Sequence, residues 1–295
     1  MSFLNELKQN IRQSGKVTYE FIAINVGLFL IFNILFIFER LIFRTGIIEL
    51  FYQKYLFLPG SLENLVTRPW TILTYMFLHA GLWHILVNML FLFWFGRLLE
   101  EYLGRKKVIS LYFLGGIAGG LLYIISYNIF PYLQDQLDYA LLVGASASVM
   151  AILVASATLL PDYTFFLLLL GPVKLKYIAL VLVILDFLSI AGSNPGGMIA
   201  HLGGALFGFL FIRQLRKGND FSKPFMKVVD GLGSLFRRKP TLKVKYTNKS
   251  KAGNPAQPLS KQDEIDAILD KISKSGYESL SAEEKNKLFR ASGKD

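Results

Sequence analysis

The sequence predicts an all-α membrane protein, a bundle of six transmembrane helices followed by a small cytoplasmic helical tail. Hydrophobic residues make up 53% of the 295 residues and charged residues only 18%, against about 25% charged residues in a soluble domain. Several charge-free runs approach or exceed the roughly 20 residues that a transmembrane helix needs. Lys and Arg gather on alternate connections between these runs, which is typical of a multi-pass protein.

The charge-free runs place the six spans along the chain. They lie at about 18–38, 82–99, 107–127, 139–159, 175–192 and 196–213. The fifth span contains one acidic residue, Asp186. The long first loop, 39–68, is half apolar, and we expect it to lie in the outer leaflet.

The distribution of positive charge predicts the orientation in the cell membrane. Basic residues occupy the segment before the first span, the connections between spans two and three and between four and five, and the segment after span six: Lys8, Arg12, Lys16, Arg105, Lys106, Lys107, Lys174, Lys176, Arg213, Arg216 and Lys217. Segments 128–140 and 192–198 carry no Lys or Arg. The positive-inside rule then places both termini in the cytoplasm.

The tail explains most of the net charge of +11, because 213–251 holds twelve Lys or Arg and two Asp. Apolar residues recur among them at helical spacing, which predicts a basic amphipathic helix on anionic lipid. Nucleic acid is the rival partner, which tethering beside a membrane disfavours. Residues 251–259 form a linker, and a helical hairpin follows with a capping box at Ser281–Glu284. The predicted domains are 1–17, 18–213, 214–259 and 260–292.

All three histidines, His79, His84 and His201, lie in or at the edge of predicted spans. Ionisable side chains are costly in a bilayer, so each is a functional candidate. Histidine is the side chain suited to proton transfer at neutral pH. His84 and Asn88 are four residues apart and share one helix face.

Ser146 and His201 are expected at similar depth below the outer face. At helical rise, Ser146 lies about 10 Å below Tyr139, and His201 lies about 8 Å below Gly196. Histidine can take the proton from an attacking serine, and acyl transfer also needs fixed donors for the oxyanion. His84, Asn88 and the backbone N–H of Ser146 can supply these donors.

Small residues accompany the polar ones. Gly204, Ala205 and Gly208 continue the helix face of His201 and permit close approach of another helix. The glycines between 115 and 120 also predict close helix packing rather than a phosphate-binding loop. Cysteine is absent, and neither an HExxH motif nor an acidic cluster accompanies the histidines. We therefore expect neither a metal nor a cofactor.

Three motifs in order resemble the rhomboid family of intramembrane serine proteases: the decapeptide HAGLWHILVN at 79–88, Gly144-Ala145-Ser146, and AHLGGALFG at 200–208. Trp70 and Glu100 also fit the family pattern. The resemblance covers about 15–215. It implies that Ser146 is the nucleophile, His201 the general base, and His84 and Asn88 the oxyanion hole. It further implies that His79 supports the outer loop, and that the substrates are single-span transmembrane proteins.

The chain departs from the family at three positions. Ala147 stands where Gly is usual, Met150 where Tyr or Phe often stacks on the histidine, and Thr71 where Arg is common. A thioether can still pack against the imidazole. The alternative function is therefore a weak or inactive rhomboid-like protein that binds membrane proteins. A transporter is a third possible class, but transporters usually contain an internal repeat, and the sequence shows no convincing repeat.

Asp186 admits two interpretations. We expect it to face water or a hydroxyl in the cavity; alternatively, it orients His201 as a third member of the site. Because a peptide bond in a helix is shielded by its hydrogen bonds, substrates should carry helix-weakening residues in their outer third and a small residue at the cut. We expect the flexible element to be span five with the uncharged segment 193–197.

Overall fold

The computed structural model describes residues 16–167, 171–236 and 261–292, which are mostly helical. The chain divides into two units, Met1–Arg238 and Lys239–Asp295. The predicted linker 251–259 and most of the predicted N-terminal segment, 1–15, lie outside the described residues.

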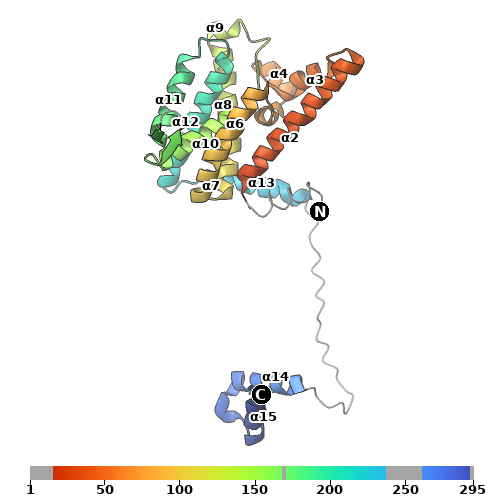
Figure 1. The fold of residues 1–295 in the computed structure, drawn as a ribbon, viewed down its shortest axis with the longest axis vertical. Coiled ribbons are helices and arrows are strands. Elements are labelled where there is room, and N and C mark those ends of the chain that lie inside the picture. Colours follow the sequence, from red (N-terminus) through yellow and green to blue (C-terminus); the bar gives the residue numbers. More distant parts are fainter. Residues whose placement is uncertain (1–15, 168–170, 237–260, 293–295) are drawn as a thin grey trace. The chain divides into compact units, whose positions relative to one another are not determined.

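Four long apolar helices form the frame of the first unit (Figure 1). They are α2 (Val17–Phe38) with its π-helical continuation to Phe43, the continuous run of α6 (Leu82–Phe91), η3 (Leu92–Gly96) and α7 (Arg97–Leu103), then α8 (Arg105–Ile129) and α12 (Pro195–Arg216). Within the described residues, these four are long and apolar enough to cross a membrane by length and composition. Each coincides with a predicted span.

The two remaining predicted spans are shorter helices. Helices α10 (Ser146–Leu159) and α11 (Leu175–Leu188) have 14 residues each. At 1.5 Å per residue each is about 21 Å long, short of a hydrocarbon core of about 30 Å. The six-crossing topology therefore stays a prediction.

Short elements line the connections, and some of them are strands. Helices α3 (Ile47–Leu56) and α4 (Leu62–Thr67) lie in the first loop, followed by α5 (Thr71–Thr74) and η2 (Tyr75–Phe77), while α9 is Pro131–Gln134. Strands β1 (Leu58–Pro59) and β2 (Leu141–Leu142) pair antiparallel, with Leu58 opposite Leu142. Strands β3 (Thr164–Leu167) and β4 (Gly171–Lys174) form a hairpin. The described residues are mostly helical, as predicted, and these short strands in the connections were not predicted.

The fourth span does not begin at Tyr139 as predicted. Pairing with β1 keeps the backbone extended through β2, and the N–H of Gly144 donates to the carbonyl of Tyr75 at 3.0 Å. The helix starts only at Ser146. Helical rise from Tyr139 therefore does not give the depth of Ser146, and that part of the depth argument is wrong.

The first loop presents apolar side chains outward. Helix α3 exposes Ile47, Leu50 and Phe51, and α4 exposes Leu62 and Val66. Exposed apolar residues on short helices are compatible with a position at the membrane interface. Placement in the outer leaflet stays a prediction.

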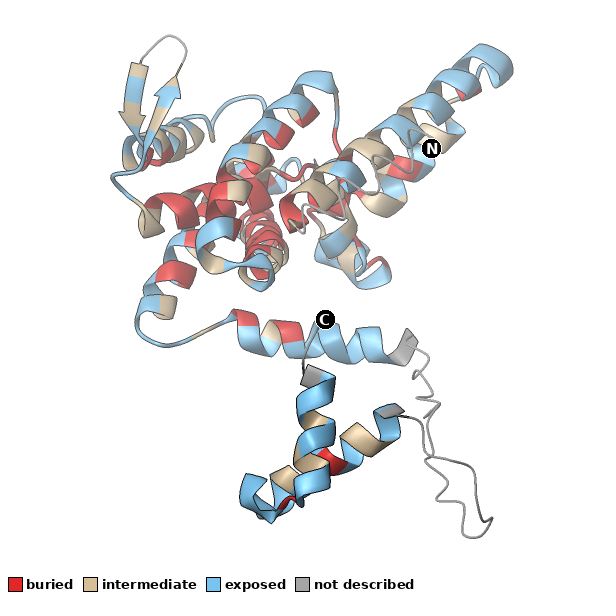
Figure 2. Ribbon diagram, turned by 60° about the horizontal axis from the view of Figure 1, so that its bottom comes forward, coloured by how far each residue is buried: buried red, intermediate tan, exposed pale blue. Residues whose placement is uncertain are grey.

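The core lies where α8, α10 and α12 pack together, and buried residues concentrate there (Figure 2). A Cβ on Gly204 would lie 2.1 Å from the carbonyl oxygen of Ala147, and one on Gly208 would lie 2.2 Å from that of Ala151. A Cβ on Gly119 would lie 2.5 Å from the carbonyl oxygen of Ala200. Close helix packing through small residues, as predicted for both glycine groups, is confirmed.

Glu100 anchors the start of α2. Its carboxylate accepts hydrogen bonds from the backbone N–H of Val17 at 2.6 Å and of Thr18 at 3.0 Å, and from the Thr18 hydroxyl at 2.7 Å. A carboxylate at a helix N-terminus satisfies free N–H groups and complements the helix dipole. Glu100, which follows the second predicted span, thus stabilises the N-terminus of α2, the first predicted span.

The tail contains the predicted amphipathic helix, α13 (Ser222–Phe236). Lys107 at the start of α8 pairs with Asp220 and donates to the Ser222 hydroxyl at 2.8 Å. The exposed side chains of α13 include Val228 and Leu232. This helix is therefore attached to the basic end of α8, with apolar residues left facing outward.

The second unit consists of α14 (Lys261–Ser275), η4 (Tyr277–Ser279) and α15 (Ala282–Ser292). The predicted capping box is present. The N–H of Ser281 donates to Glu284 at 2.7 Å, and the N–H of Glu284 donates to the Ser281 hydroxyl at 3.3 Å. Lys271 of α14 also pairs with Glu284 at 2.9 Å, which joins the two helices of this unit.

Candidate active site

Ser146 occupies the first position of α10, two residues after Gly144. Gly144 has φ +135°, a conformation that disfavours residues with a side chain. A Cβ at Gly144 would also lie 2.7 Å from Nε2 of His84 and 3.3 Å from Oγ of Ser146. Only glycine leaves room for the His84 ring beside Ser146, which explains the Gly-x-Ser spacing.

His84 and Asn88 both lie on α6, as their spacing predicts. The backbone N–H of Ala80 donates to Nδ1 of His84 at 3.5 Å. Because Nδ1 accepts, the neutral ring carries its proton on Nε2, the nitrogen nearest Gly144. Asn88 donates one amide N–H to the carbonyl of His84 at 2.8 Å. Its second N–H remains as a donor.

His201 lies in the second turn of α12, which begins at Pro195. Asn194 caps this helix, accepting from the N–H of Gly197 at 3.0 Å. Nδ1 of His201 lies 3.1 Å from Oδ1 of Asp186 on α11. Both side chains are mostly buried, with exposed fractions of 18% for His201 and 15% for Asp186.

The contact with His201 corrects our expectation for Asp186. We expected the carboxylate to face water or a hydroxyl, and the structure instead pairs it with the histidine. Helix α11 ends at Leu188, so Asp186 lies near its end rather than deep within a span reaching 192. The alternative interpretation requires this contact, and the role of Asp186 in orienting His201 stays a prediction.

One cavity of about 300 Å³ brings the predicted residues together. It is lined by Ser146, His201, His84, Asn88, Asp186 and Met150, together with Trp83, Val87, Phe91, Val149 and Leu182. The last five were not predicted. Four of them lie three or four positions from a predicted residue on the same helix, so helical spacing could have found them.

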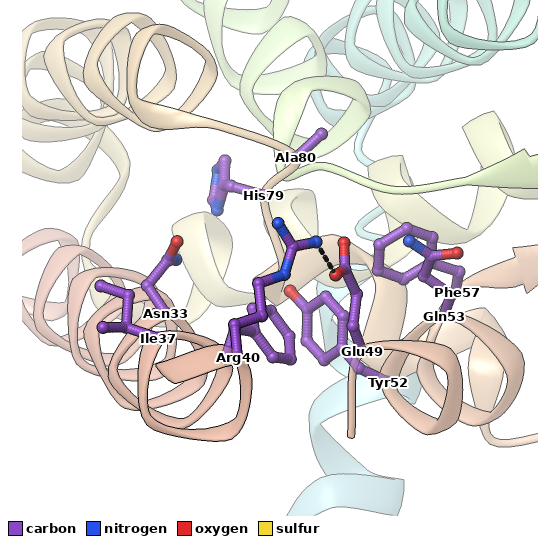
Figure 3. Close-up of a pocket in the computed structure, with 10 residues that line it drawn as sticks. Asn33, Ile37, Arg40, Glu49, Tyr52, Gln53, Phe57, His79 and Ala80 are labelled. Carbon is purple, nitrogen blue, oxygen red and sulfur yellow. Dashed lines mark hydrogen bonds and ion pairs between the residues drawn. The ribbon is translucent and has the colours of Figure 1, made fainter. Parts of the chain in front are cut away.

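His79 lies outside this cavity. Its ring is 5.1 Å from that of His84, centroid to centroid, but it lines a second cavity of about 310 Å³ (Figure 3). That cavity lies beside α2 and α3, where Arg40 pairs with Glu49. His79 is buried, and in the described part of the chain neither ring nitrogen has a hydrogen-bond partner. This position beside the first loop is compatible with a supporting role.

Two departures from the family pattern are accommodated by packing. Ala147 is buried, and its Cβ faces Gly119, where a second Cβ would approach it to 2.6 Å. Met150 is also buried and lines the cavity with His201. Among the described residues, no group of three or more His, Asp or Glu is placed to hold a metal ion.

Comparison with known proteins gives two matches along the chain. Residues 66–217 match the Rhomboid domain, and 256–294 match DUF6576, a family of unknown function. The first match covers about half of the chain and includes every residue that lines the candidate active site.

Three relatives illustrate the range of the family. The chain is 30% identical over 169 residues to RHOMBOID-like protein 12, mitochondrial, of Arabidopsis thaliana, covering 54% of this chain and 50% of that protein. It is 34% identical over 145 residues to "Putative rhomboid protease YdcA" of Bacillus subtilis, covering 48% and 64%. It is 33% identical over 82 residues to Inactive RHOMBOID-like protein 8 of Arabidopsis thaliana, covering 28% and 23%.

The chain spans about half to two thirds of the first two of these relatives. Its relatives include one named as a putative protease, one named as inactive, and others named as mitochondrial or chloroplastic. Membership in this family therefore does not by itself establish proteolytic activity. The apolar helices agree with a multi-pass membrane protein. On the match over 66–217, the chain belongs to the rhomboid family.

Proposed function

We propose that this protein is an intramembrane serine endopeptidase that cuts transmembrane proteins near the outer membrane face, with Ser146 as nucleophile and His201 as general base. The observation that carries the proposal is the single cavity that both side chains line. The helices that bear them are in backbone contact at Gly204 and Ala147, three residues and one residue away. Such contact limits how far the two side chains can drift apart.

The proposed reaction is acyl transfer in two steps. Oγ of Ser146 bonds to the scissile carbonyl carbon while its proton passes to Nε2 of His201, and the carbonyl π electrons move to oxygen. The C–N bond then breaks, and the amine leaves with the proton from Nε2. Water attacks the acyl-enzyme with the same proton transfers, releasing the acid and restoring both side chains.

The oxyanion requires donors fixed where negative charge develops. The assigned tautomer directs the Nε2–H of His84 toward the space beside Ser146. The remaining amide N–H of Asn88 lies on the same helix face. The backbone N–H of Ser146, at the start of α10, is free of intrahelical bonding and adds a third donor.

The substrate proposal follows from the cost of unwinding. An unpaired amide in hydrocarbon costs several kcal/mol, so good substrates carry Gly, Pro, Ser or Asn in the outer third of a single span. The 14-residue helices α10 and α11 are shorter than a bilayer core. Short helices favour local thinning of the bilayer, which brings water nearer to the site.

The topology and partners belong to this proposal. Six crossings with both termini cytoplasmic place α13 at the inner face, where its basic and apolar residues suit anionic lipid. The cell membrane is the proposed location. No nucleic-acid partner is proposed for the tail.

The alternative is a weak or inactive rhomboid-like protein that binds membrane proteins. Two observations favour it: the match to an inactive relative, and the Met150 thioether where an aromatic ring often supports the histidine. A binding protein would keep the cavity but lack a reactive serine.

A fluorophosphonate probe separates the two functions, because it labels only an activated serine. We expect the wild-type protein to be labelled and to cut a model transmembrane substrate, and Ser146→Ala and His201→Ala to do neither while staying folded in detergent. Ser148→Ala is the matched control, since Ser148 lies on α10 but does not line the cavity. An unlabelled and inactive wild type would overturn the protease and support the binding protein.

A further inference from the structure

Two tyrosine hydroxyls connect η2 with α8 in opposite directions. Tyr75 of η2 donates its hydroxyl to the carbonyl of Gly116 on α8 at 2.6 Å. Tyr112 of α8 donates its hydroxyl to the carbonyl of Met76 on η2 at 2.7 Å. A carbonyl can only accept, so each hydroxyl must be the donor. Both tyrosines are buried, with exposed fractions of 1% and 0%.

Helix α2 takes part in the same contact. Asn25 of α2 donates an amide N–H to the Tyr112 hydroxyl at 3.0 Å, so this hydroxyl accepts one hydrogen bond and donates another. The ring of Tyr112 also stacks on Phe21 of α2, with ring centroids 4.1 Å apart. Linked hydrogen bonds strengthen one another where water is excluded. The three-residue helix η2 is therefore held by α8 directly and by α2 through Tyr112.

The backbone of η2 in turn holds the segment before Ser146. The N–H of Gly144 donates to the carbonyl of Tyr75 at 3.0 Å. Gly144 lies against the His84 ring, since an added Cβ would lie 2.7 Å from its Nε2. Ser146 follows two residues later. Tyr75 thus binds α8 with its side chain and the candidate active site with its carbonyl.

We propose that Tyr75 and Tyr112 are positioning residues for the segment from Gly144 to Ser146. This inference rests on the proposed protease function. The two hydroxyls fix η2 against α8, and η2 fixes the N–H of Gly144, which sets where Ser146 and the His84 ring meet. Neither tyrosine lines the cavity, so both act through the backbone rather than on the substrate.

The rival explanation is that the two hydroxyls only stabilise the fold. Tyr75→Phe separates the two explanations, because it removes one oxygen atom and keeps the buried ring. Gly116 lies in the middle of α8, where its carbonyl also accepts a helical N–H. The substitution therefore leaves this carbonyl paired, and we expect the variant to fold in detergent.

Tyr123→Phe is the matched control. Tyr123 also lies on α8 and is 1% exposed, but its hydroxyl has no hydrogen-bond partner among the described residues. The chemical change and the degree of burial match those of Tyr75→Phe, and only the link to η2 differs. This variant should keep the wild-type kcat.

Kinetics give the first readout. A displacement of 1 Å at the reacting groups can cost about 10²-fold in rate. We expect Tyr75→Phe and Tyr112→Phe to lower kcat on a model transmembrane substrate by about 10-fold to 10²-fold, with fluorophosphonate labelling slowed in parallel. KM should stay nearly unchanged, because neither side chain lines the cavity. All variants are compared at a temperature where thermal unfolding in detergent shows that each is folded.

The amide of Gly144 gives a second readout that needs no activity. A weakened hydrogen bond shifts the amide proton resonance upfield and speeds its exchange with solvent. In protein labelled with 15N-glycine, the signal that disappears in Gly144→Ala identifies this amide. We expect both changes at Gly144 in Tyr75→Phe and in Tyr112→Phe, and neither change in Tyr123→Phe.

The outcomes are distinguishable. A wild type that neither cuts nor labels refutes the protease, while the Gly144 amide still tests the link through η2. If the wild type is active, a wild-type kcat in Tyr75→Phe and Tyr112→Phe overturns the proposal and identifies a purely structural role. A lowered kcat with an unchanged Gly144 amide also overturns it, as does an equal loss of kcat in Tyr123→Phe. If one of the two variants does not fold, the other decides.

Discussion

The helices that bear Ser146 and His201 differ sharply in packing from the helix that bears Asp186. Ten of the 14 residues of α10 and eleven of the 22 residues of α12 are buried. In α11, only Leu175 and Ala179 of 14 residues are buried. Ser146 and His201, the proposed nucleophile and base, thus lie on closely packed helices, whereas Asp186 lies on a loosely packed one.

Side-chain size explains this difference. Helices α10 and α12 meet through Gly and Ala, so their backbones touch. Helix α11 is built from Leu, Val and Ile, and it exposes most of them, including Leu180, Val181 and Ile184. In a bilayer these side chains suit contact with lipid rather than with another helix. Substitutions should therefore disturb the two regions in different ways.

Gly204→Ala should have the largest effect, because it separates α10 from α12. The new Cβ would lie 2.1 Å from a backbone carbonyl that cannot rotate away. Overpacking of this kind costs about 1–3 kcal/mol, and the displacement should abolish cleavage. Thermal unfolding in detergent and turnover measure both effects.

Gly27→Ala is the control for this substitution, since a Cβ there meets nothing within 4 Å. It should leave the melting temperature and turnover near those of the wild type. A Gly204→Ala protein with wild-type turnover would show that α10 and α12 are not rigidly held.

Gly144→Ala should have the next largest effect, confined to the site. The methyl group would meet the His84 ring at 2.7 Å, on a backbone with φ +135°. We expect labelling of Ser146 to slow by about 10²–10³, the usual loss for an oxyanion donor. The melting temperature should fall less than in Gly204→Ala.

Gly81→Ala tests whether the position matters. Gly81 precedes α6 near His84, its φ of −178° suits any residue, and no atom lies within 4 Å of an added Cβ. It should label at the wild-type rate. Equal slowing in both variants would contradict the steric role assigned to Gly144.

Hydrogen exchange should distinguish α11 from its neighbours in the unmodified protein. Amides in loosely packed segments open more often than amides in the core. We expect amides of 177–186 to exchange faster than those of 148–157 in detergent, with no change in sequence needed. Equal protection of the two helices would show that α11 is packed as tightly as α10.

Local sequence patterns predicted much of the fold and site. Hydropathy found the four long helices, and the spacing of His84 with Asn88 placed both on one face. Gly204 and Gly208 predicted the close approach of another helix, which in the structure is α10. Each of these features depends on residues within one helix, where spacing determines which side chains share a face.

Features that depend on pairing between distant segments were missed or, for Asp186, left open between two interpretations. Strand β2 forms because Leu142 pairs with Leu58, far away in sequence. Hydropathy alone therefore predicted a helix for the start of 139–159. The contact of Asp186 with His201 depends on how α11 sits against α12. The capping of α2 by Glu100 likewise joins residues more than 80 positions apart.

The smallest expected effect concerns the start of α11, where Asp162 holds two lysines. Its Oδ1 lies 3.0 Å from Nζ of Lys174, the cap residue, and 2.9 Å from Nζ of Lys176 in the first turn. The hydrogen bond from Lys176, and then that from Lys174, lowers the pKa of Asp162 below its ordinary value of 3.8. A lowered folded-state pKa means that the pair stabilises this end of α11 at neutral pH. The contribution is lost as the pH falls below about 3.8.

Because all three side chains are well exposed, screening by water keeps this contribution small. We expect the protection factors of amides 175–178, which correct for the pH dependence of chemical exchange, to fall slightly between pH 7 and pH 3. Asp162→Asn should show the lower protection already at pH 7 and little further change in acid. Amides of α10 should show no such difference, since they belong to the closely packed region. If α10 loses as much protection in acid as α11, the loss is global, and the ion pairs of Asp162 with Lys174 and Lys176 do not stabilise α11.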